Sequence, residues 1–290
     1  MSSDRTIFQK MGSKNDKWNA VSAGRRSAQY LNTVSHDNAS FGTVRSVGLV
    51  ARLLSVETMI QIQAVIFDAY GTLLDVHSAM ARNADRLGAT WPQISADWRQ
   101  KQLEYSWIRS LAGPSHHRDF WHLTQDALAW AAARHGLRDE AVLADVLMSY
   151  RHLDPYPEVP VLLRKIRDRK LATAILSNGE PGMLADAVRS ANIDQLLDFV
   201  LSVETVGVFK PDQRVYRLAE ERLKLAANQM AFVSSNPWDA FGAHAFGFQV
   251  FWINRTDQPV EYGLHGLVTE LTDLAALPDA LGVSLSRSSE

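Results

Sequence analysis

The sequence has 290 residues, 46% of them hydrophobic, which is enough for one large core and a smaller one. A net charge of −2 offers no basic surface to neutralise a phosphate backbone, so we expect no nucleic-acid partner. The lack of cysteine excludes disulfides and thiolate chemistry, and the lack of roughly 18 uninterrupted apolar residues predicts no membrane partner.

Residues 1–58 are rich in Ser, Asn, Lys and Arg, contain few acids and show no apolar periodicity, which predicts a disordered N-terminal extension. Such a composition is also that of a transit peptide. We favour a mis-assigned start, because Met59 lies just before the first predicted strand. The apolar run at 47–56 contains Arg52 and lies far from the N-terminus, so we discount secretion and expect a cytoplasmic location.

From residue 63 onward, apolar strands alternate with amphipathic helices, a pattern typical of a parallel sheet covered on both faces. Five strands are predicted, at 63–67, 172–176, 199–203, 230–234 and 249–253. The long Ala-, Leu- and Trp-rich segment between the first two strands is predicted to be helical. We therefore expect an α/β protein, with a Rossmann-like doubly wound parallel sheet core at 59–76 and 155–284, an inserted helical cap at 77–154 and a C-terminal tail at 285–290.

Polar side chains follow several predicted strands, and in open α/β sheets ligands bind beyond the carboxyl ends of the strands. The first of them, Asp68, directly follows an apolar run and should be exposed there as a nucleophile. A cap inserted after the first strand would close over this crevice. The residues collected in this way are Asp68, Tyr70, Thr72, Ser177, Asn178, Lys210, Ser234, Ser235, Asn236 and Asp239.

Each of these groups also has a purely structural interpretation. Asp68 fits an ordinary turn, and 177–179 fits an Asn-Gly turn. Asn236 fits a helix N-cap followed by a proline at the first helical position. Lys210 precedes a proline and is therefore extended, where a lone lysine is more often solvated than catalytic. Taken singly, none of these short motifs is specific.

Together, four segments resemble the motifs of the haloacid dehalogenase superfamily, and their wording is closest to the L-2-haloacid dehalogenases, the type II 2-haloacid dehalogenases. These segments are 67–73, 176–179, 209–211 and 232–239, and the resemblance covers about residues 60–280. It implies hydrolysis of short L-2-haloalkanoic acids to D-2-hydroxy acids and halide. The implied route is an Asp nucleophile, an aspartyl-ester intermediate and inversion at C2, without a cofactor.

The motifs depart from those of the superfamily phosphatases, which need a second acid to protonate the leaving oxygen and an acidic pair to hold magnesium. Tyr70 stands in place of the second acid, and Ser235 stands where one of the paired carboxylates would be, so Mg²⁺ loses a ligand. Displacing a halide requires no leaving-group proton, and the fixed charge of Lys210 can replace the ion. We therefore expect no metal.

The resemblance assigns a role to each catalytic candidate. The roles are nucleophile for Asp68, orientation and ionisation of that carboxylate for Lys210, anchoring of the lysine for Ser234, positioning of the carboxylate for Thr72 and Asn236, and polarisation of the hydrolytic water for Asp239. Ser177 and the backbone N–H groups of its turn are the expected clamp for the substrate carboxylate. Asn178 is expected to line the pocket.

Within the predicted cap, Arg99 matches the arginine that receives the departing halide in this family. Arg99, Leu103 and Trp107 lie at i, i+4 and i+8, so one helix edge presents a guanidinium beside apolar side chains. A surface arginine on an amphipathic helix is the alternative. Leu103, Trp238 and Tyr70 are the expected apolar wall around the alkyl group of the substrate, and such walls also occur simply as core.

Two rival functions remain open, a metal-dependent phosphatase of the same fold and a non-catalytic dimeric binding protein. Retention of the nucleophile, the lysine and Asp239 argues against the second. A histidine metal site is disfavoured, because neutral imidazoles need further ligands at defined geometry. The histidines concerned are His116, His117 and His122. The resemblance and the aromatic surplus of the predicted cap imply a homodimer, although apolar patches can equally face the core.

Overall fold

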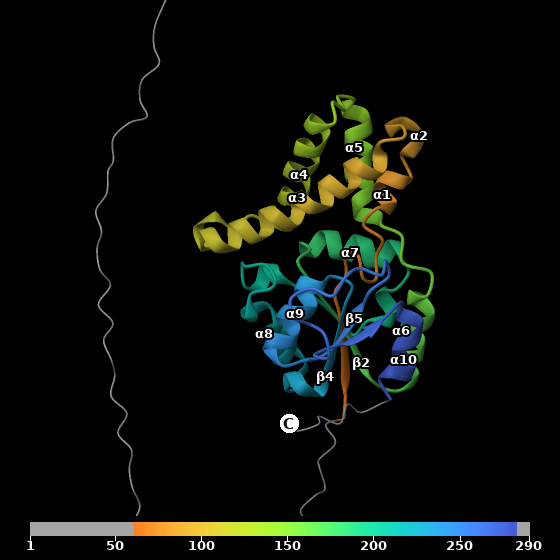
Figure 1. The fold of residues 1–290 in the computed structure, drawn as a ribbon, viewed down its shortest axis with the longest axis vertical. Helices are drawn as coiled ribbons and strands as arrows, with labels where there is room; N and C mark the ends of the chain where they lie inside the picture. Colours follow the sequence, from red (N-terminus) through yellow and green to blue (C-terminus); the bar gives the residue numbers. More distant parts are fainter. Residues whose placement is uncertain (1–60, 283–290) are drawn as a thin grey trace, which may run out of the picture. The chain divides into compact units, whose positions relative to one another are not determined.

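The computed structural model describes residues 61–282. Its core is a six-stranded, wholly parallel sheet in the order β3-β2-β1-β4-β5-β6 (Figure 1). The strands are β1 (Ala64–Phe67), β2 (Ala172–Ser177), β3 (Phe199–Ser202), β4 (Met230–Ser234), β5 (Gln249–Ile253) and β6 (Thr269–Leu271). The strand order reverses direction between β1 and β4, which is where doubly wound sheets place their ligand crevice.

The strands form in short runs of apolar, β-branched and aromatic residues, because the strands of a parallel sheet are buried on both faces. All four residues of β1, Ala-Val-Ile-Phe, are buried, and so are all five of β4. The five predicted strands are confirmed to within one residue at each end. The sixth, β6, was missed because Thr-Glu-Leu is a short, partly exposed edge segment without an apolar run.

Helices cover both faces of the sheet, and Figure 1 shows α8 and α9 on one side with α6 and α10 on the other. The core helices are α6 (Val159–Asp168), α7 (Pro181–Ser190), α8 (Gln213–Leu223), α9 (Pro237–Phe246) and α10 (Leu277–Ala280). Short 3-10 helices lie between them, η3 (Asp194–Leu196), η4 (Val203–Thr205), η5 (Ala227–Gln229) and η6 (Leu274–Ala276). Among residues 61–282, no helix combines the length and apolar character needed to cross a membrane.

The insertion between β1 and β2 is helical and forms the cap. Its elements are α1 (Ser78–Ala81), α2 (Ala84–Leu87), α3 (Trp91–Ala112), η1 (Pro114–His116), α4 (Phe120–Arg134), α5 (Glu140–Ser149) and η2 (Tyr150–His152). Helices α3 and α4 are joined by side chains as well as by apolar packing. The buried indole of Trp98 donates to the Thr124 carbonyl at 2.8 Å, and the Gln102 amide donates to the Thr124 hydroxyl at 3.0 Å.

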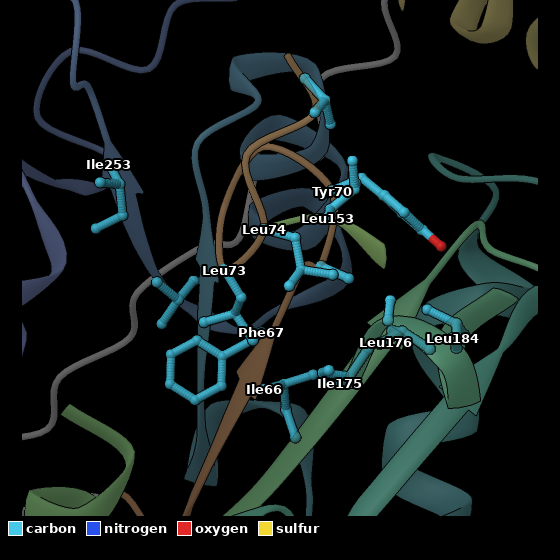
Figure 2. Packing of buried hydrophobic residues seen from close by; sticks show 14 of the residues in the cluster. Ile66, Phe67, Tyr70, Leu73, Leu74, Leu153, Ile175, Leu176, Leu184 and Ile253 are labelled. Carbon is cyan, nitrogen blue, oxygen red and sulfur yellow. The ribbon is translucent and has the colours of Figure 1, made fainter. Parts of the chain in front are cut away.

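The chain passes between core and cap twice, and the two passages pair with each other. Leu74 forms an antiparallel bridge with Pro155, the Asp75 N–H donates to Asp154 O at 2.8 Å, and the Tyr156 N–H donates to Leu73 O at 3.0 Å. Figure 2 shows the buried side chains of β1 and β2 continuing into those of this crossing. The hydrophobic core therefore reaches the loop in which the functional candidates begin. The predicted extension at 1–58 and the tail at 285–290 lie outside the described residues.

Candidate active site

Asp68 is the first residue after β1, and the local backbone fixes where its carboxylate points. The Asp68 N–H donates to Val233 O at 2.9 Å, which extends the pairing with β4 by one bond. The chain then turns tightly around the Ala69 carbonyl, with Gly71 at a φ of +89°, a conformation that glycine adopts without strain. We expected an exposed carboxylate, but Asp68 is only 6% exposed, because neighbouring loops cover it.

Both carboxylate oxygens of Asp68 accept hydrogen bonds from the protein. Oδ2 accepts from Asn236 Nδ2 at 2.8 Å and from Thr72 Oγ1 at 3.2 Å. Oδ1 lies 3.2 Å from Lys210 Nζ. Donors of this kind hold a carboxylate in one orientation. The structure therefore brings together the predicted nucleophile and the three residues predicted to position it.

Lys210 is buried, with 1% of its surface exposed, so the interpretation of a solvated lysine is wrong. Its ammonium bridges Asp68 Oδ1 at 3.2 Å and Asp239 Oδ2 at 2.8 Å, and it lies 5.0 Å from the centre of the Phe232 ring. Burial alone would lower the pKa of Lys210, but the charges of Asp239 and Asp68 outweigh it and raise that pKa. The lysine is thus a permanent cation between two carboxylates.

Asp239 is fully buried in the first turn of α9. Besides the lysine, it accepts a hydrogen bond at Oδ1 from the Tyr216 hydroxyl at 2.7 Å. Burial and the nearby Asp68 raise the pKa of Asp239 to about 6, against the opposing pull of Lys210 and the tyrosine. Sequence reasoning missed Tyr216, because it lies on the buried face of α8 and looks like an ordinary core aromatic.

One of the predicted roles, that of Ser234, does not match the contacts. Ser234 was expected to anchor Lys210, but within residues 61–282 no hydrogen bond joins them, and Ser234 Oγ instead accepts the Asn236 N–H at 3.1 Å. The Lys210 ammonium is held by the carboxylates of Asp68 and Asp239 instead. Asn178, which was expected to line the pocket, accepts the backbone N–H of Lys210 at its Oδ1, at 3.0 Å. It therefore fixes the lysine-bearing loop.

Two more candidates from the core are Ser177, which keeps a free donor, and Asn236, whose side chain bonds the site and not the helix end. Ser177 is buried, and its Oγ accepts the Gly179 N–H at 3.1 Å, which leaves its own O–H available to donate. Asn236 occupies the N-cap position of α9, as predicted, but its side chain makes no capping bond. The amide reaches Asp68 and the Tyr70 carbonyl instead. A residue placed like a helix cap thus serves the site.

One edge of α3 faces the core loops. Arg99 Nη2 donates to Tyr70 O at 3.3 Å, and the Trp107 ring lies edge-on to Trp238 with centroids 5.4 Å apart. Leu103, half-buried, lies on α3 between these two positions. The structure therefore brings Arg99 and Trp238 to the same region as Asp68 and excludes the alternative of an isolated surface arginine.

Tyr70 extends from the loop after β1 (Figure 2) and stacks on Tyr150, with centroids 5.8 Å apart. Burial raises the pKa of Tyr70 well above its ordinary value, so its hydroxyl stays neutral. Several side-chain donors around this loop are buried without a protein partner, which costs about 1–3 kcal/mol for each. Within residues 61–282 they include the Tyr70 hydroxyl, Arg99 Nη1, Trp107 Nε1, Ser235 Oγ and Arg255 Nε. An anion bound beside Arg99 would accept from its free Nη1.

His117 and His122, two of the three histidines considered as metal ligands, pair with carboxylates other than Asp68 and Asp239, and the His117 ring packs against Phe209, with centroids 5.1 Å apart. His117 Nε2 is 2.9 Å from Glu204 Oε2, His122 Nδ1 is 2.8 Å from Asp119 Oδ2, and His116 is exposed. In the described part of the chain, no three His, Asp or Glu side chains are grouped so that they could hold a metal ion. Between the two site carboxylates, the position for a cation is taken by the ammonium of Lys210.

A buried carboxylate at the end of the central strand, fixed by an ammonium beneath an inserted helical cap, defines a hydrolase with an aspartate nucleophile. The model of the family "haloacid dehalogenase-like hydrolase" matches residues 62–247. The chain belongs to this family and, within it, to the (S)-2-haloacid dehalogenases.

Similarity to individual proteins extends over most of the described residues. The (S)-2-haloacid dehalogenase 4A of Burkholderia cepacia is 43% identical over 228 residues, 78% of this chain and 98% of that protein. A dehalogenase solved with an intermediate complex is 41% identical, with a TM-score of 0.74 over 77% of this chain and 98% of its own. The L-2-haloacid dehalogenase of Xanthobacter autotrophicus, solved with chloropropionic acid covalently bound, is 36% identical, with a TM-score of 0.68 over 77% and 99%.

Proposed function

We propose that this protein hydrolyses short L-2-haloalkanoic acids to D-2-hydroxy acids and halide, as an (S)-2-haloacid dehalogenase. The observation that carries the proposal is the Asp68 carboxylate, which one ammonium and two neutral donors hold at the end of β1. Its relatives support the same chemistry, because they are (S)-2-haloacid dehalogenases. One of them has been captured with chloropropionic acid covalently bound.

In the first half-reaction an oxygen of Asp68 attacks C2 of the substrate, and the carbon–halogen bond breaks with its electron pair leaving on the halide. One displacement at C2 inverts that centre. The halide requires no proton, which suits a site where burial raises the pKa of Tyr70 well above its ordinary value and makes it a poor acid. The unpaired Nη1 of Arg99 is the proposed halide donor, Ser177 the donor to the substrate carboxylate, and Leu103 and Trp238 the apolar wall.

In the second half-reaction water attacks the carboxyl carbon of the Asp68 ester, and the bond from that carbon to the oxygen attached to C2 breaks. The former Asp68 oxygen leaves on the product, and an oxygen from water replaces it in the carboxylate. Asp239 accepts a proton from that water and returns it to the departing oxygen, so that the product leaves as an alcohol. The second proton of the water goes to solvent as Asp68 becomes a carboxylate again. A base whose pKa is about 6 is mostly ionised at neutral pH and still basic enough to work. Lys210 holds both carboxylates in place throughout.

Ester hydrolysis should slow as the pH falls below about 6, because protonation removes the negative charge of Asp239. Tyr216→Phe deletes a hydrogen bond that lowers this pKa, so the acid limb should move to higher pH. The measurement is the single-turnover rate of product release across the acidic and neutral range. Tyr262→Phe, at a half-exposed tyrosine, is the matched control and should leave the limb in place. An unmoved limb in Tyr216→Phe would refute this role for Asp239.

A metal-dependent phosphatase is the alternative within the family, and it is not favoured because Tyr70 and Ser235 replace groups that such an enzyme needs. We expect chloride release from L-2-chloropropionate, much slower release from the D-isomer and no loss of rate with a chelator. Faster hydrolysis of a phosphate ester, or loss of activity with chelator, would favour the phosphatase. Tight binding of a carboxylate without any halide release would favour a non-catalytic binding protein.

We also propose that the enzyme is a homodimer in the cytoplasm, with the cap at residues 77–154. The dimer is supported by exposed apolar side chains near the end of α3, where Ile108 is 59% and Leu111 84% exposed. Light scattering that gives the mass of one chain would exclude the dimer, and recovery outside the cytoplasmic fraction would exclude the location.

The cap boundaries are supported by the pairing of Asp75 with Asp154. Cleavage by protease in this pairing, with both fragments still folded, is the expected test result.

A further inference from the structure

Arg255 follows β5 closely and contacts two other segments of the core. Its Nη1 lies 2.6 Å from Glu158 Oε1, and its Nη2 donates to the Thr72 carbonyl at 3.2 Å. The guanidinium also lies over the Tyr156 ring, 3.8 Å from its centre. The Arg255 side chain is 18% exposed. One cation therefore joins the end of β5, the loop after β1 and the start of α6.

Those contacts meet at a point where the nucleophile and the cap are connected. Thr72 donates to Asp68 from its hydroxyl and offers its carbonyl to Arg255. Tyr156 lies on the passage that returns from the cap, and its N–H donates to Leu73 O. A displacement of this carbonyl would move the Thr72 hydroxyl, and with it one of the three groups that hold the Asp68 carboxylate.

The chemistry of the contact requires arginine. A planar guanidinium can bond two acceptors in fixed directions while it stacks on an aromatic ring, whereas a lysine ammonium is a point charge that cannot do all three. A purely structural brace would lower stability when removed but would leave the rate of the bound enzyme nearly intact. The two roles therefore differ in what they predict for kcat and KM.

We propose that Arg255 is a positioning residue, which keeps Thr72, and through it Asp68, in register with the passage that leads back from the cap. This role rests on the proposed dehalogenase function. Because Arg255 bonds the loop after β1 and not the expected substrate-binding groups, its loss should slow attack by Asp68 without weakening substrate binding.

The test compares Arg255→Met and Arg255→Lys with Arg86→Met, which removes an exposed arginine paired with Asp145 inside the cap. We expect kcat to fall by about tenfold in Arg255→Met with KM unchanged within about twofold, because small displacements of a reacting group cost this much. Arg255→Lys should keep only part of the parent's kcat, and it replaces Arg255→Met in this comparison if the Met protein does not fold. Arg86→Met should behave as the parent. An unchanged kcat, or a rise in KM alone, would overturn the proposal.

Two further readouts separate this role from a general loss of structure. In a Thr72→Val background the effect of Arg255→Met on kcat should shrink, because the hydrogen bond from the Thr72 hydroxyl to Asp68, through which Arg255 acts, is gone. A full effect in this background would overturn the proposal. Amide hydrogen exchange at residues 69–74 should quicken in Arg255→Met while β4 is unaffected, and an unchanged loop would also overturn it. Exchange needs no substrate, so it decides the position of the loop even if the parent releases no halide and the proposed function fails.

Discussion

Asp68→Asn should abolish halide release, with kcat lower by at least about 10⁴-fold, because an amide does not act as the nucleophile. The substitution keeps the size of the side chain, and its amide oxygen can still accept from Asn236 or Thr72. We therefore expect a folded protein. The measurement is chloride release from L-2-chloropropionate, with the mass of the variant checked for deamidation back to aspartate.

Asp145→Asn provides the matched control. Asp145 is an exposed carboxylate in the cap, paired with Arg86 at 2.6 Å, and the same chemical change there should leave the rate as in the parent. If the verified Asp68→Asn protein released chloride as fast as this control, Asp68 would not be the group that bonds to carbon.

Lys210→Met should cost both activity and stability. The substitution removes the ammonium that lies between two buried carboxylates, and breaking a buried ion pair from one side costs about 3–5 kcal/mol of the free energy of unfolding. We expect kcat to fall on the order of 10³-fold, because the nucleophile loses its orienting charge while the cap and the substrate-binding groups remain. Denaturant unfolding and single-turnover kinetics measure the two effects separately.

The pH dependence of that destabilisation gives a sharper test. Lys210 opposes the upward shift of the Asp239 pKa, so its loss raises this pKa further above the usual 3.8. A carboxyl whose pKa is raised in the folded state opposes folding increasingly as the pH climbs above its unfolded value. The deficit of Lys210→Met should therefore be larger at about pH 8 than at about pH 5. Lys165→Met, at an exposed lysine, should show neither effect, and a pH-independent deficit in Lys210→Met would contradict the account.

The core of the fold was predictable because its signals are local. The run Ala-Val-Ile-Phe is buried on both faces and ends at an acid and a glycine turn, so β1 and Asp68 could be located from neighbouring residues alone. Asn236 was placed correctly at the start of α9 for the same reason. What its amide contacts could not be read in this way, because Asp68 lies 168 positions away.

The missed parts depend on contacts between distant segments. Tyr216 and Asp239 are 23 residues apart, and nothing in the local pattern of α8 distinguishes a tyrosine that donates to a buried carboxylate from one that only fills the core. Arg255 meets Thr72 across 183 residues. Ser234 was predicted to anchor Lys210 but bonds the Asn236 N–H, because a resemblance between motifs carries no information on distances between atoms. The contacts of these residues could be identified only from the three-dimensional structure, in which the strands are assembled into the sheet.

The central claim is that the Asp68 carboxylate forms a covalent ester with the substrate, and a single turnover of L-2-chloropropionate in ¹⁸O-labelled water tests it most directly. With enzyme in excess, mass analysis of the peptide that contains Asp68 should find one labelled oxygen in the protein, because water attacks the carboxyl carbon of the ester. The first product formed should then carry unlabelled oxygen from Asp68. Label in the product alone, with an unlabelled peptide, would mean that water attacks C2 directly, and it would contradict the account.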